Sequence, residues 1–114
     1  MNTLIKNSVL IVDDQKLNIS TLRNILDSEY TIYASTDGQD AIETAGEFLP
    51  DVILLDIIMP EMDGYEVISS LKNSPKTCNI PVIFTTGLDN SEAEIKGLAL
   101  GGADFIPKPF LPEI

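Results

Sequence analysis

The chain alternates between short apolar runs and stretches whose apolar residues recur every three or four positions. The runs occupy residues 9–12, 30–34, 52–55, 82–85 and 103–106. Most are apolar at nearly every position, which is typical of strands buried on both faces. The stretches between them match amphipathic helices. This order predicts an α/β fold, a mostly parallel sheet with right-handed crossovers and helices on both faces.

Local signals predict where the helices begin and end. A capping box needs a polar cap three residues before Gln or Glu. Three pairs fit: Thr36 with Gln39, Asp63 with Glu66, and Ser91 with Glu94. The apolar stripe of the first helix is predicted to be Leu17, Ile19, Leu22, Ile25 and Leu26, and that of the second Ala41, Ile42, Ala45, Phe48 and Leu49. Pro50 is predicted to end the second helix, and Gly101 with Gly102 the fourth.

Composition narrows the class of protein. The 114 residues, 44 % of them hydrophobic, fit one domain with one core. Eighteen acidic residues against seven basic ones give a net charge of -11, which argues against direct nucleic-acid binding. No apolar run approaches the roughly 20 residues of a membrane span, so we expect no membrane association. A lone cysteine suits a reducing compartment, so we expect a cytoplasmic location. A single cysteine, Cys78, and no histidine argue against a disulfide, a zinc site and a Ser–His pair.

The last predicted strand leaves little chain behind it. Residues 107–114 could begin a fifth helix but are too few to complete one. We therefore expect the final helix to be truncated or missing, and the first helix alone to cover one face of the sheet. We also expect residues 1–114 to be the N-terminal part of a longer protein.

Polar residues follow the strands at the edge where open α/β sheets bind ligands. They are Asp13 and Asp14 after the first strand, Asp56 after the third, Thr85 and Thr86 at the end of the fourth, and Lys108 after the fifth. Three carboxylates in one crevice repel one another unless protons or a cation neutralise them. Hard oxygen ligands of this kind select Mg²⁺ or Ca²⁺, and a site of one or two carboxylates with waters suits Mg²⁺. A carboxylate, a metal, a lysine and a hydroxyl together favour phosphoryl transfer to aspartate.

Four segments carry a specific resemblance. They are LIVDD at 10–14, LLDIIMPEMDG at 54–64, PVIFTTG at 81–87 and GADFIPKPF at 102–110. In their order and spacing they resemble the receiver domain of two-component response regulators, the CheY-like superfamily. The resemblance covers essentially the whole chain. It implies a flavodoxin-like, doubly wound, five-stranded parallel sheet with strand order 2-1-3-4-5.

The resemblance also implies roles for the acidic residues. Asp56 matches the phosphoacceptor. Asp14 would ligate Mg²⁺ directly and Asp13 mainly through water. The backbone carbonyl of Ile58 would complete the protein ligands.

Further roles follow for the last two strands. Thr86, and not Thr85, matches the switch hydroxyl, and strand alternation would turn Thr85 away from it. Lys108 matches the lysine that contacts the phosphoryl group. Phe105 matches the aromatic switch position, although plain core packing explains a phenylalanine there equally well.

The implied function is that of a phosphoacceptor signalling domain. A histidine kinase or phosphotransfer protein would phosphorylate Asp56, and the switched domain would control an output domain in cis or a protein partner, with homodimerisation as a further option. Ile58 and Leu88 are apolar where fast-dephosphorylating relatives often carry polar residues, which predicts slow autodephosphorylation. Two alternatives stay open: an interaction module that takes no phosphate, and a phosphatase of the haloacid-dehalogenase type. The phosphatase needs a second acid where this chain has Ile58.

Overall fold

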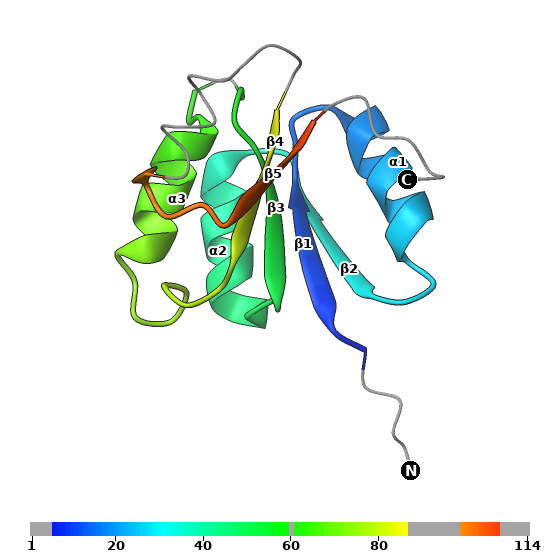
Figure 1. Cartoon of the computed structure of the whole chain (residues 1–114), viewed down its shortest axis with the longest axis horizontal. Helices are drawn as coiled ribbons and strands as arrows, with labels where there is room; N and C mark the ends of the chain where they lie inside the picture. Colours follow the sequence, from blue (N-terminus) through cyan, green and yellow to red (C-terminus); the bar gives the residue numbers. More distant parts are fainter. Residues whose placement is uncertain (1–5, 60, 87–98, 108–114) are drawn as a thin grey trace.

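The sheet has the predicted strand order. The computed structural model describes residues 6–59, 61–86 and 99–107 (Figure 1). Its strands are β1 (Ser8–Val12), β2 (Thr31–Ser35), β3 (Val52–Asp56), β4 (Val82–Thr86) and β5 (Asp104–Pro107). All neighbouring pairs are parallel, in the order β2-β1-β3-β4-β5. The doubly wound α/β prediction is therefore confirmed.

Three helices are described, and they cover the two faces unequally. They are α1 (Lys16–Leu26), α2 (Gly38–Phe48) and α3 (Gly64–Lys72). The helix α1 lies on one face of the sheet, and α2 and α3 lie on the other (Figure 1). Within the described ranges α1 is alone on its face, as the sequence predicts.

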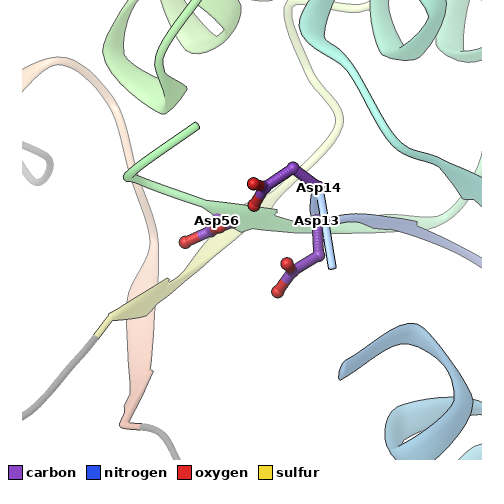
Figure 2. Close-up of side chains that lie close together, drawn as sticks. All are labelled: Asp13, Asp14 and Asp56. Atoms are coloured by element: carbon purple, nitrogen blue, oxygen red, sulfur yellow. The ribbon is translucent and has the colours of Figure 1, made fainter. Parts of the chain in front are cut away.

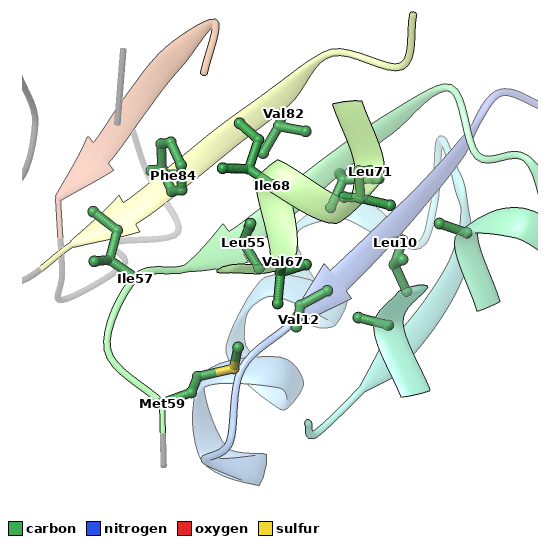
Figure 3. Packing of buried hydrophobic residues seen from close by; sticks show 13 residues of the cluster. Leu10, Val12, Leu55, Ile57, Met59, Val67, Ile68, Leu71, Val82 and Phe84 are labelled. Atoms are coloured by element: carbon green, nitrogen blue, oxygen red, sulfur yellow. The ribbon is translucent and has the colours of Figure 1, made fainter. Parts of the chain in front are cut away.

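Strand alternation divides the core into two clusters. Val9, Ile11 and Leu54 pack with Ile19 and Leu22 of α1. The intervening strand residues pack with α2 and α3 (Figure 3): Leu10, Val12, Ile53, Leu55, Val82 and Phe84. Burying one such side chain fully contributes about 1.5–3 kcal/mol. Because both faces are covered, every central strand position is apolar up to the carboxyl edge.

One of the predicted helix caps is wrong. The N-cap of α2 is Asp37, and not Thr36: the Asp37 carboxylate accepts a hydrogen bond from the backbone N–H of Asp40 at 2.8 Å. A carboxylate also interacts favourably with the positive end of the helix dipole, which a hydroxyl cannot do. The capping box of α3 is confirmed, because Asp63 and Glu66 each accept from the other's backbone N–H.

Three predicted stripe residues are not buried. Leu17 lies in the first turn of α1 and is 75 % exposed. Phe48 and Leu49 are about half exposed, and the Phe48 ring stacks on Tyr33 with centroids 4.6 Å apart. Leu49 is the left-handed C-cap of α2, with φ 49°, because the following Pro50 disfavours the right-handed helical region at that position.

Other predictions fall at or beyond the described ranges. Gly101 has the expected positive φ, 109°. The predicted cap at Ser91, most of the fourth helix and the chain after Pro107 lie outside the described residues. Among the helices that are described, none has the length and apolar character needed to cross a membrane.

Candidate functional site

The carboxyl ends of β1 and β3 bring buried acids to one edge of the sheet. Val12 pairs with Leu55, and the residue that follows each of them in the chain is an aspartate. Asp56 closes β3, and Asp13 directly follows β1, where its N–H still donates to the Ser35 carbonyl at 3.1 Å. Asp13 is 1 % exposed and Asp56 3 %. The strand ends therefore hold two carboxylates inside the fold.

Asp14 joins these two residues to form a three-carboxylate cluster (Figure 2). One oxygen of each of Asp13, Asp14 and Asp56 lies within 4.8 Å of the others. Asp14 is the more accessible member and opens the cluster to solvent. Like charges so close favour a bound cation. Carboxylate oxygens at this spacing fit a hard divalent ion such as Mg²⁺, which also keeps several waters.

Backbone N–H groups hold two of the carboxylates. Gln15 N donates to Asp13 Oδ1 at 2.9 Å, and Ile58 N donates to Asp56 Oδ1 at 3.3 Å. Both bonds span two residues, the geometry of an Asx turn. The loops that leave β1 and β3 thus orient the acids that precede them. Ile58 itself is 68 % exposed beside Asp56, so its apolar side chain lies at the solvent face of the site.

The start of α3 packs against the end of β3. Gly64 N donates to the Ile57 carbonyl at 2.8 Å. A Cβ on Gly64 would lie 2.6 Å from the Asp56 carbonyl oxygen and 2.8 Å from Ile57 Cα. Only glycine permits this approach, so α3 supports the backbone of Asp56 directly. Burial first, and then the charge of Asp63, raises the pKa of Tyr65, the residue after Gly64.

The structure places Thr85 beside Asp56, whereas the sequence put Thr85 at this edge of the sheet without a role there. Thr85 is the register partner of Asp56 across β3 and β4 and is 2 % exposed. Among the residues that the structure describes, its Oγ1 has no hydrogen-bond partner. Alternation along a single strand could separate Thr85 from Thr86 but could not align Thr85 with Asp56. The pairing of the two strands carries that information.

The remaining predicted residues are placed only in part. Thr86 is the last residue of β4, and Phe105 pairs in register with Phe84 within β5. The side chains of Thr86 and Phe105 lie outside the description, and so do Lys108 and Leu88 entirely. Their predicted roles stay predictions.

A family model for the response regulator receiver domain matches residues 9–113. The chain belongs to this family. It is 45 % identical over 96 % of its length to a probable cyclic di-GMP phosphodiesterase of Vibrio cholerae, covering 25 % of that protein. It is 43 % identical over 89 % of its length to the response regulator PleD of Caulobacter vibrioides, covering 22 % of it.

A solved structure agrees with this assignment. The chemotaxis protein CheY4 of Vibrio cholerae superimposes with a TM-score of 0.89 at 29 % identity, covering 96 % of this chain and 92 % of that one. The chain is thus a CheY-like receiver domain of two-component signalling. The family match favours this assignment over the phosphatase alternative. The receiver spans about a quarter of the length of the two curated relatives.

Proposed function

We propose that this receiver accepts a phosphoryl group on Asp56 in a Mg²⁺-dependent reaction. The observation that supports this is the convergence of Asp13, Asp14 and Asp56 within 4.8 Å, two of them almost fully buried. Of the three, Asp56 is the last residue of a central strand, and the start of α3 packs against its backbone. A nucleophile needs such a fixed position.

The same residues would hold the metal. Asp14 and Asp56 would each supply a carboxylate oxygen, Asp13 would act mainly through a bound water, and Ile58 would offer its backbone carbonyl. A bound Mg²⁺ would neutralise the cluster and the charge of the incoming phosphoryl oxygens.

The reaction is an in-line displacement at phosphorus. A carboxylate oxygen of Asp56 forms the new O–P bond, and the P–N bond of a donor phosphohistidine breaks with its electron pair going to the imidazole. A small acyl phosphate can replace that donor, and its carboxylate then leaves. We assign Lys108 and Thr86 to contact the transferred phosphoryl oxygens, and Thr86 with Phe105 to the conformational switch. The chain is its own acceptor and turns over no external substrate.

The partners follow from this chemistry. The donor is a histidine kinase or a phosphotransfer protein. Both curated relatives are about four times longer than the receiver, and one is described as a probable cyclic di-GMP phosphodiesterase. We propose that residues 1–114 likewise form the receiver of a longer cytoplasmic protein, whose output domain or partner responds to the phosphorylated state. Homodimerisation is one way to transmit that response.

Intact-mass spectrometry with Mg²⁺ and acetyl phosphate tests the proposal. One phosphoryl adduct is expected on the wild type, and none on Asp56→Asn or without Mg²⁺. Asp27→Asn removes one exposed carboxylate outside the cluster and should leave the adduct unchanged. A folded wild type without any adduct would favour the phosphate-independent interaction module, whereas release of phosphate from an external phosphoester would revive the phosphatase.

A further inference from the structure

Thr85 carries a hydroxyl that the described structure leaves unsatisfied. Its side chain is 2 % exposed and its Oγ1 makes no hydrogen bond. Burying a hydroxyl without a partner destabilises a fold relative to an apolar group of the same shape. Valine would fill the same space in a strand without this cost. A threonine here therefore suggests a state of the protein in which the hydroxyl is bonded.

The sheet register places one carboxylate directly beside that hydroxyl. Asp56 pairs with Thr85, and Thr85 pairs with Ile106. Side chains in one row of a parallel sheet point to the same face, with the strands about 5 Å apart. Ile83 and Ile106 both pack in the cluster with α1, which places Thr85 and Asp56 on that face. Thr85 is thus the immediate lateral neighbour of the proposed nucleophile.

We propose that Thr85 is a positioning residue whose hydroxyl donates to the Asp56 carboxylate in the Mg²⁺-bound receiver. The inference rests on the proposed function. The carboxylate can accept from both Ile58 N and a hydroxyl, because its two oxygens offer about four acceptor sites. A change of the Thr85 χ1 rotamer is enough to turn the hydroxyl within its row. The bond would fix the carboxylate in the orientation that ligates the metal.

Ser35 provides the matched control. It is the other described side chain with a buried hydroxyl lacking a partner, and it is also 2 % exposed. Its row differs, because Ser35 pairs with Val12, which pairs with Leu55 and then Phe84. That row is apolar and faces α2 and α3. Ser35 meets the acidic cluster only through its backbone carbonyl, which accepts from Asp13 N. Because Ser35→Ala keeps that carbonyl, the variant relieves the same kind of burial cost and leaves the bond to Asp13 in place.

The test compares Thr85→Val, Thr85→Ser and Ser35→Ala in the whole chain. The Mg²⁺ dissociation constant is measured by NMR titration of backbone amide shifts with Mg²⁺ alone. The urea midpoint is measured in EDTA. Thr85→Val is expected to raise the metal-free urea midpoint and to weaken Mg²⁺ binding about tenfold or more, the loss expected for one hydrogen bond to a charged group. Thr85→Ser should bind Mg²⁺ nearly as the wild type does, and Ser35→Ala should change the midpoint alone.

Each other outcome overturns the inference. Unchanged Mg²⁺ affinity in Thr85→Val would make the hydroxyl a purely structural defect. If Thr85→Ser lost as much Mg²⁺ affinity as Thr85→Val, the methyl group and not the hydroxyl would be responsible. If Ser35→Ala lost as much, removal of any buried hydroxyl would weaken Mg²⁺ binding. If the wild type forms the Asp56 adduct and Thr85→Val binds Mg²⁺ as tightly as the wild type, only this inference fails. If the wild type neither binds Mg²⁺ nor forms the adduct, the proposed function fails.

Discussion

Gly64→Ala should damage both the fold and the phosphoacceptor, because the new methyl group meets backbone and not a movable side chain. The added Cβ would lie 2.6 Å from the Asp56 carbonyl oxygen, 2.8 Å from Ile57 Cα and 3.2 Å from the Asp56 carbonyl carbon. Ordinary contacts begin near 3.4 Å. Either α3 or the end of β3 must therefore move by about 0.8 Å to relieve the closest contact.

The contacts that this movement changes lower the free energy of unfolding of Gly64→Ala. Overpacking a tight site costs about 1–3 kcal/mol. The 2.8 Å bond from Gly64 N to the Ile57 carbonyl weakens as well, worth about 0.5–1.5 kcal/mol. Alanine also lowers the backbone entropy of the unfolded chain, which offsets about 0.4–1 kcal/mol of this loss. The expected net loss in the free energy of unfolding is about 1–3 kcal/mol, or about 4 °C in Tm per kcal/mol.

Asp56 should be affected beyond this loss of stability. Its backbone is the contact surface, and a displacement approaching 1 Å at a reacting group can reduce a rate about 100-fold. The assay is the initial rate of Asp56 phosphorylation by acetyl phosphate with Mg²⁺, measured by intact mass well below the Tm of the variant. Circular dichroism in urea gives the stability of the same samples.

Gly46→Ala is the matched control. Gly46 lies within α2, and a Cβ there would meet nothing within 4 Å. This variant should gain about 0.5–1 kcal/mol from helix propensity and keep the wild-type phosphorylation rate. The reasoning is refuted if Gly64→Ala is as stable as the wild type and phosphorylates at the same rate.

Two further predictions concern the helix cap and the solvent face of the site. Asp37→Ala should lower the free energy of unfolding in urea by about 1 kcal/mol, because it removes the hydrogen bond from Asp40 N. Thr36→Ala should leave the free energy of unfolding nearly unchanged, and equal losses in the two variants would contradict Asp37 as the cap. Ile58→Asn should shorten the lifetime of the phosphorylated state severalfold, because an amide can hold the attacking water where an exposed apolar side chain cannot. Loss of the adduct is followed by intact mass, with Phe48→Asn as an exposed control, and an unchanged lifetime would refute shielding by Ile58.

The sequence by itself determined the elements and the acids. Nearly continuous apolar runs predicted β3 and β4 to within one residue, because strands buried on both faces have few polar positions before their carboxyl ends. The Asp63 capping box was predicted correctly because its signal lies within four residues. The placement of Asp13, Asp14 and Asp56 at strand ends followed from the same local pattern.

Other features depended on contacts that a linear pattern does not contain. Thr36 and Asp37 are adjacent, and both residue types can cap a helix. In the structure Asp37 is the N-cap, with an extended backbone before the first turn of α2. Leu17 fits a helical stripe in spacing, yet α1 begins only one residue earlier and leaves it exposed.

The decisive relation at the site belongs to the tertiary structure alone. Thr85 adjoins Asp56 because β3 and β4 pair in one register, and a shift of one residue would place a different side chain beside the carboxylate. That register is set by hydrogen bonds and packing between segments far apart in the chain. Local sequence determines which side chains reach the edge of the sheet, and strand pairing determines which of them meet.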